Sequence, residues 1–230
     1  MRLSAVRYGT TEPEVDPTLR TYEPIGADDG ILGVMRVGVA HHFGWAVAVT
    51  ASADHRVVDR RRIELIEPGM PTAPIHHEGK PLGDAAISEL VAEVRASVAR
   101  ATSASLDALA AALPEPIVSV SLRAWPLDFP EDIIVQRRAP YESRADSIMY
   151  RQVLAELVRA CGWVVHFYEA KNVEDRAARI LAERADEVLY GPRATLGPPW
   201  TRDHRMALAA TILAAESRAE PGYSQASSHA

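Results

Sequence analysis

The chain has 230 residues, of which 47% are hydrophobic, and its formal net charge is −6 at pH 7. Such a length allows one domain with a substantial core, and the negative charge argues against coating nucleic acid by bulk attraction, although a local basic groove stays compatible with it. No stretch approaches about 18 uncharged apolar residues and the N-terminus lacks an apolar signal core, so we expect a cytoplasmic protein with no membrane partner. The single cysteine, Cys161, agrees with that compartment, and we expect it to be buried in a helix.

Residues 1–30 are acidic and punctuated by Pro and Gly, so we interpret them as a leader ahead of a domain over 31–217. The domain opens with two nearly all-apolar segments that flank His41-His42-Phe43-Gly44. A short connection containing Gly joins antiparallel strands, and uninterrupted apolar residues are typical of strands covered on both faces. Residues 34–50 therefore predict a buried β-hairpin with two histidines at its tip.

The next segments predict a third strand, a loop and a long helical region. Residues 56–65 form the strand, and their density of charge marks it as a sheet edge. Residues 67–82 carry several prolines and a second histidine pair, His76-His77, so we expect an ordered loop without regular structure. A helix is predicted from Asp84, and the Thr/Ser-rich segment 102–105 is expected to interrupt it.

The rest of the domain alternates strands and helices. Strands are predicted at 117–123, where a parallel crossover strand fits, at 133–138 as a short extra strand, and at 163–168. Helices are expected from Ser143 to Gly162, from 172 to 189, and from Thr201 or Asp203 to Ala214. The first of these opens with Ser143-Arg144-Ala145-Asp146, which resembles a capping box. Residues 218–230 should form a disordered tail.

This order of elements, a three-stranded meander followed by alternating helices and strands, resembles the RNase H-like superfold and in particular its RuvC-like branch of Holliday-junction resolvases. The resemblance covers about residues 34–215. Its local parts are Val37-Gly38-Val39-Ala40 with Gly44-Trp45-Ala46, which looks like that branch's first hairpin, and Asp203-His204-Arg205-Met206-Ala207-Leu208-Ala209, which looks like its final helix. It implies an α/β domain with an RNase H-like mixed sheet and helices on both faces.

The resemblance also implies a two-metal nuclease site, for which this sequence lacks carboxylates in two places. The first strand of that family ends in an Asp and the fourth presents a Glu or Asp, whereas the matching positions here are Ala40 and the segment 121–123. Only Asp203 matches a carboxylate of the motif. Because a two-metal mechanism needs carboxylates to hold both ions, the resemblance predicts a degenerate metal site and carries no nuclease activity to this chain.

Histidines beside a carboxylate are the alternative source of metal ligands. His41, His42 and His204 fall at predicted turns or a helix start, with Asp203 adjacent to the last. Imidazole with carboxylate suits a divalent metal, here Mg²⁺, Mn²⁺ or Zn²⁺, although adjacent histidines on a regular strand face opposite sides. Structural or ion-pairing histidines explain the same residues. Asp203 and His204 are the candidate catalytic residues, and His41, His42 and Asp203 are the candidate metal ligands.

Two segments that place Arg beside an aromatic residue precede helices. They supply a candidate anion-binding or nucleic-acid-binding set: Arg137, Arg138, Tyr141, Arg144, Trp200, Arg202 and Arg205. Helix N-termini favour anions, and Arg with stacking aromatics suits single-stranded nucleic acid. Helix capping and neutralisation of local acids explain the same residues.

The sequence therefore predicts a non-catalytic RNase H-like module that binds nucleic acid, a nucleotide or a protein partner. The alternative is a divergent metal-dependent nuclease with His and Asp ligands.

Overall fold

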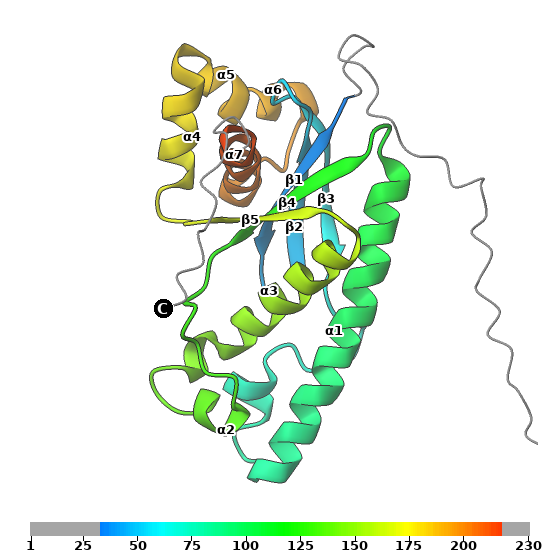
Figure 1. Cartoon of the computed structure of the whole chain (residues 1–230), viewed down its shortest axis with the longest axis vertical. Helices are drawn as coiled ribbons and strands as arrows, with labels where there is room; N and C mark the ends of the chain where they lie inside the picture. Colours follow the sequence, from blue (N-terminus) through cyan, green and yellow to red (C-terminus); the bar gives the residue numbers. More distant parts are fainter. Residues whose placement is uncertain (1–32, 218–230) are drawn as a thin grey trace, which may run out of the picture. The chain divides into compact units, whose positions relative to one another are not determined.

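The computed structural model describes residues 33–217, and a five-stranded mixed sheet with the order β3-β2-β1-β4-β5 forms its centre (Figure 1). Strand β1 pairs antiparallel with β2 and parallel with β4; β2 pairs antiparallel with β3, and β4 parallel with β5. This arrangement confirms the predicted α/β class with a mixed sheet, in which a three-stranded antiparallel meander is followed by parallel strands. The strands are β1 (Met35–His41), β2 (Trp45–Ala51), β3 (Val57–Glu64), β4 (Ile117–Arg123) and β5 (Val164–Tyr168).

Helices cover both faces of the sheet, as predicted, and each face has its own hydrophobic core (Figure 1). One face carries α1 (Asp84–Ala112) and α3 (Glu142–Ala160), with α2 (Ile133–Gln136) and the π-helical turn η1 (Pro74–Glu78) beside them. The other face carries α4 (Val173–Leu181), α5 (Ala185–Tyr190) and α7 (Arg202–Glu216). The 3-10 turn η2 (Ala182–Arg184) joins α4 to α5, and α6 (Pro192–Leu196) precedes α7.

The predicted hairpin is confirmed and is buried on both faces. Val37 and Val39 of β1 belong to the core beneath α1 and α3, whereas Ala40 belongs to the core beneath α7. Gly38 permits the close packing of α7, since a Cβ at this position would lie 1.8 Å from the carbonyl oxygen of Ala207. The small residues of α7 and β1 therefore bring helix and sheet into direct contact.

The expected interruption of the first helix is wrong, because α1 continues to Ala112. Thr102 is buried and its hydroxyl donates to the carbonyl of Leu65, and the Ser105 hydroxyl donates to the carbonyl of Glu64 at 2.7 Å. These polar side chains dock α1 on the end of β3. Both residues keep a helical backbone conformation while their hydroxyl groups bond to another segment. The helix propensity of single residues does not predict such an arrangement.

Three further expectations around η1 and α2 are corrected. Residues 133–136 form a helix in place of the expected strand, with Asp132 as N-cap accepting from the Ile134 N–H. Residues 67–82 are not wholly irregular, since they contain η1. The capping box at 143–146 is also wrong: α3 begins at Glu142, and the buried Asp146 carboxylate accepts the N–H groups of Ile75 and His76, both at 2.9 Å. Asp146 thus caps η1, which is distant in sequence.

The remaining corrections concern single residues and helix ends. The helix expected over 172–189 is divided, because Ala182 adopts a φ of +51° between α4 and η2. Cys161 is exposed at the C-terminal end of α3, and Gly162 follows it with a φ of +77°, which ends that helix as expected. Within residues 33–217 we find no helix long and apolar enough to cross a membrane. The expected leader over 1–30 and tail over 218–230 lie outside the described residues.

Candidate functional site

A pocket opens beyond the carboxyl ends of β1 and β4, where ligands commonly bind in open α/β sheets. Its volume is about 210 Å³, and five residues line it, which define the strand-end pocket: His41, His42, Phe43, Arg123 and Ser147. They come from the hairpin tip, the last residue of β4 and the second turn of α3. Phe43 is 40% exposed and Arg123 is exposed, so an aromatic ring and a guanidinium are both accessible beside the pocket.

Arg151 supplies a second positive charge behind this pocket. Its side chain belongs to α3, is 6% exposed, and donates to the carbonyls of Ala124 at 2.7 Å and Ser147 at 2.9 Å, and to the Ser147 hydroxyl at 3.1 Å. Burial lowers the pKa of Arg151 to about 10, and the neighbouring Arg123 contributes in the same direction. The guanidinium remains charged at neutral pH, so a buried cation is bonded to a residue that lines the pocket.

His41 is held neutral in the same place. Burial lowers its pKa to about 3, and the charges of Arg151 and Arg123 add to this effect. The backbone of Ser147 has a smaller, opposite effect and favours the protonated ring. At neutral pH the imidazole therefore carries one donor and one acceptor nitrogen, and the positive field at the pocket comes from the two arginines.

His42 lines the strand-end pocket and also reaches the start of α7. Its Nε2 lies 3.0 Å from Asp203 Oδ2 at the start of α7, and its ring stacks on Trp45 with centroids 4.2 Å apart and an interplanar angle of 13°. The Arg62 guanidinium lies 4.3 Å from the centroid of the same Trp45 ring and pairs with Glu64. The structure thus brings His42 and Asp203 together. The side chain of His41 is directed away from them, because neighbouring residues along a strand face opposite sides of the sheet.

The positions that would hold two metal ions in the resembled family offer no suitable donors. Ala40 is buried against α7, Leu122 is buried in the opposite core, and the Ser121 hydroxyl donates to the Ala210 carbonyl at 3.1 Å. Asp203 pairs with His42. Among residues 33–217, no three His, Cys, Asp or Glu side chains are grouped so that they could share a metal ion. The residues present therefore do not fit a two-metal site.

His204 and Trp200 are built into the fold around the start of α7. His204 is buried; its Nδ1 accepts the backbone N–H of Thr201 and lies 2.9 Å from the Thr201 hydroxyl, which makes Thr201 the N-cap residue of this helix. Burial lowers the pKa of His204, with a smaller contribution from Arg60. Trp200 is 6% exposed and its indole N–H donates to the Leu189 carbonyl at 2.8 Å, so its ring is not a surface stacking platform.

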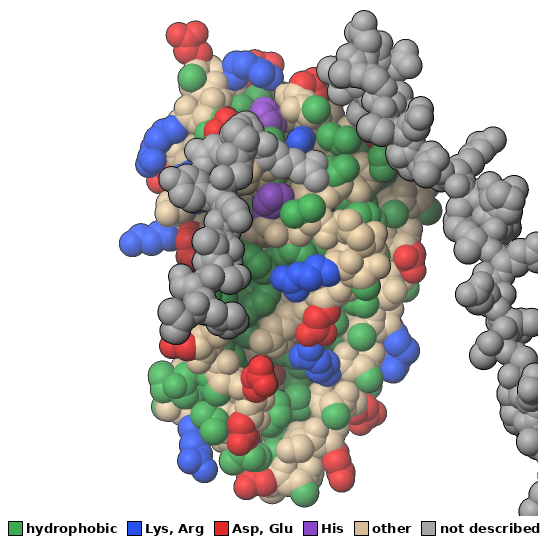
Figure 2. Space-filling view, in the orientation of Figure 1, with side chains coloured by type: hydrophobic (Ala, Val, Ile, Leu, Met, Phe, Trp, Pro, Cys, Tyr) green, Lys and Arg blue, Asp and Glu red, His purple; other side chains and the backbone are tan. Residues whose placement is uncertain are grey.

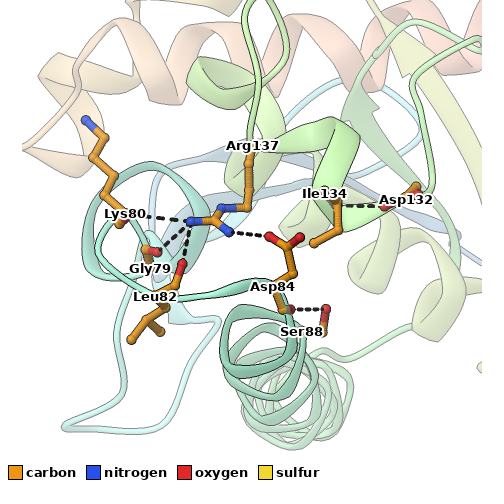
Figure 3. A network of polar contacts seen from close by, with 8 residues as sticks. All are labelled: Gly79, Lys80, Leu82, Asp84, Ser88, Asp132, Ile134 and Arg137. Carbon is orange, nitrogen blue, oxygen red and sulfur yellow. Dashed lines mark hydrogen bonds and ion pairs between the residues drawn. The ribbon is translucent and has the colours of Figure 1, made fainter.

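Arg137 joins three segments at the α2 end of the domain, as Figure 3 shows. One terminal nitrogen donates to the carbonyls of Gly79, Lys80 and Leu82, and the other pairs with Asp84 at the start of α1. Its side chain is 19% exposed. Arg137 therefore acts as a clamp on the chain that leads from η1 into α1.

The other predicted anion-binding residues fall into two separated groups. Arg138 and Arg144 are exposed near the start of α3, and Tyr141 packs edge-on against Phe129 with centroids 5.7 Å apart. Arg202 and Arg205 lie on α7, on the opposite face of the sheet, and both pair with Glu174. Arg205 also lies 5.1 Å from the Tyr190 ring centroid. The two groups do not line one groove, because α3 and α7 pack on opposite faces of the sheet (Figure 1).

Sequence reasoning missed Arg123, Arg151, Phe43 and Ser147. Arg151 carried a signal, because it lies three residues from Ile148 and Leu154 and so falls on the apolar stripe of its helix. On the face shown in Figure 2, outside the grey atoms, acidic and basic side chains are interspersed. The net charge therefore does not decide whether a local part of the surface attracts anions.

The chain was compared with protein family models, curated proteins and solved structures. No protein family model matches the chain, and no curated protein matches its sequence. The solved structures that are similar include Thermus thermophilus RuvC and T. thermophilus RuvC in complex with a Holliday junction substrate. Each is 12% identical to this chain with a TM-score of 0.45 and covers 81% of it, and the match spans 97% of the first structure's chain and 96% of the second's.

Proposed function

We propose that this protein is a non-catalytic RNase H-like module that binds single-stranded nucleic acid at the strand-end pocket. The observation that carries the proposal is the composition of that pocket: the exposed Arg123 and Phe43 beside the buried cation Arg151, with no carboxylate in its lining. Arginine side chains with an accessible aromatic ring suit phosphates and unstacked bases. Duplex DNA does not present its bases to such a ring.

The proposal is tested by fluorescence anisotropy with labelled single strands over a range of salt concentrations. Arg123→Gln should weaken binding and lower the slope of log affinity against log salt by about 0.7, the value for one lost phosphate contact on a single strand. Phe43→Ala should weaken binding by about 1–3 kcal/mol, as loss of one stacked base does.

Arg100→Gln is the matched control, since Arg100 is an exposed arginine on α1 that pairs with Glu67. It should leave both affinity and slope unchanged. Equal effects of Arg123→Gln and Arg100→Gln would mean that binding follows general charge, and the pocket would lose its role. Arg138→Gln and Arg144→Gln, run beside them, decide whether the exposed arginines near α3 extend the interface.

The His42–Asp203 pair favours a second candidate, a divergent nuclease, because the two side chains meet at 3.0 Å. A carboxylate-oriented imidazole is the arrangement of a general base, and Asp203 with His42 supplies two ligands for a divalent ion. Cleavage assays on branched, duplex and single-stranded substrates with Mg²⁺ or Mn²⁺ test this candidate. Cleavage by the wild type that Asp203→Asn abolishes would establish it and would contradict the non-catalytic proposal.

A further inference from the structure

Arg151 is a buried cation for which the described residues provide no anion. The ion pairs of residues 33–217 include neither Arg151 nor Arg123. The Arg151 guanidinium donates to carbonyl oxygens and one hydroxyl, and it lies 5.9 Å from the centroid of the Trp125 ring, none of which carries a full negative charge. Burying a charge is costly unless an opposite charge compensates it. Arg137, which also donates to carbonyls, has the Asp84 carboxylate as its counter-ion. The half-buried Arg60 donates to carbonyls of residues 196–199 and, within residues 33–217, likewise has no carboxylate in an ion pair, but unlike Arg151 it is not fully buried.

The charges at Arg151 and Arg123 act on the same small volume. Arg151 donates to the Arg123 carbonyl at 3.4 Å and to the Ser147 hydroxyl at 3.1 Å, and both of these residues line the strand-end pocket. The charges of both arginines also lower the pKa of His41, which lines the pocket as well. The pocket lining includes no carboxylate; Asp203, which meets His42 at 3.0 Å, is engaged in that pair.

From these contacts we infer that the strand-end pocket receives a terminal phosphate monoester, the phosphorylated end of a nucleic-acid strand, as the missing counter-ion of Arg151 and Arg123. The inference rests on the proposed function and specifies which part of the strand the pocket selects. A phosphate monoester carries a charge of about −1.5 to −2 at pH 7, which matches two guanidinium groups. A phosphate inside a strand carries a single charge.

The dimensions of the pocket agree with an end group. Its volume of about 210 Å³ is below the range of roughly 300–1,000 Å³ found for sites that enclose a drug-sized ligand. It accommodates a phosphate and part of its sugar, while the rest of the strand leaves through the open side. Phe43, at the tip of the hairpin, is placed for the terminal base to stack on its exposed ring.

The test compares short labelled oligothymidylates that carry a 5′-phosphate, a 3′-phosphate or hydroxyl groups at both ends. The full-length wild type should bind one phosphorylated form about tenfold more tightly than the hydroxyl form, as expected for added hydrogen bonds to a charged group. Inorganic phosphate should remove the difference by competition. The preference should also fade as the pH falls below about 6, where the monoester takes up its second proton.

Variants test whether the preference for a phosphorylated strand end comes from the strand-end pocket. Arg123→Gln, at an exposed position, should fold like the wild type and lose the preference, and Arg151→Met should lose it as well, whereas Arg100→Gln should retain it. If Arg151→Met fails to fold, Arg123→Gln decides alone. Equal binding of phosphorylated and hydroxyl strands overturns the end-group inference and leaves the proposed function standing; no binding of any strand overturns both. A preference that survives Arg123→Gln removes the pocket as its source.

Discussion

At the residue scale, the start of α7 separates two roles that the sequence places side by side. Thr201 is the N-cap residue and exchanges contacts with His204, while Asp203 turns toward His42 at the hairpin tip. A capping residue satisfies backbone N–H groups that the helix itself leaves without partners. The stability of α7 should therefore depend on Thr201, and Asp203 should matter mainly for the orientation of His42.

Thr201→Ala should cost about 0.5–2 kcal/mol in the free energy of unfolding, as loss of an N-cap does, and Thr201→Ser should retain most of it. Asp203→Asn should cost less than Thr201→Ala, because Asp203 is not the cap. Urea denaturation of the three variants measures this order. If Asp203→Asn proves the more destabilising, the cap belongs to Asp203 after all.

At the element scale, the contact between α7 and β1 depends on the absence of a side chain at Gly38. A Cβ there would approach the Ala207 carbonyl to 1.8 Å, and the atoms in its way belong to the backbone of a buried helix. Backbone of this kind moves only with the whole helix. The same contact positions Asp203 beside the hairpin tip, so packing and site geometry are linked through one glycine.

Gly38→Ala should destabilise the protein by about 1–3 kcal/mol or more, the usual cost of overpacking a core, and should lower the melting temperature. Gly83→Ala is the control, because nothing lies within 4 Å of a Cβ at Gly83 and its φ of −72° suits any residue. A Gly38→Ala variant as stable as Gly83→Ala would show that α7 does not pack on β1 as described.

For the whole molecule, histidines that are buried or half-buried tie stability to pH. The pKa of His41 falls to about 3, chiefly through burial, and burial also lowers the pKa values of His55 and His204. The unfolded chain, in which these rings titrate near 6.5, binds more protons than the folded one below that pH. The stability they contribute is therefore complete above about pH 6.5 and is lost as the pH falls.

Between pH 6.5 and 5 the free energy of unfolding should fall with decreasing pH, and the contribution of His41 should rise to about 1.4 kcal/mol per pH unit as the pH approaches 5. His41→Gln should make this slope shallower by that amount. Denaturation series in phosphate-free buffers measure the slopes, so that no anion occupies the pocket. Identical slopes for wild type and His41→Gln would mean that the His41 ring is charged in the folded protein.

Local signals in the sequence were enough to predict the succession of the main strands and the burial of the first hairpin. Periodicity and turn residues act over a few positions, as in the apolar segments on either side of His41-His42-Phe43-Gly44 and in the glycine after Cys161. The absence of carboxylates at Ala40 and 121–123 is likewise evident from the amino-acid sequence, because it depends only on residue identity.

The roles of the polar side chains, by contrast, followed from tertiary contacts. Asp146 caps η1, Thr102 docks α1 on the end of β3, and Arg137 clamps the chain before α1, although local spacing predicted a capping box, a helix break and an anion site for these residues. Each of these side chains bonds to backbone at least 37 residues away. Likewise, Arg123 and Arg151 come together behind His41 because β4 ends beside α3 in the folded chain. Which charges surround a pocket depends on the three-dimensional arrangement of the elements and does not follow from sequence spacing.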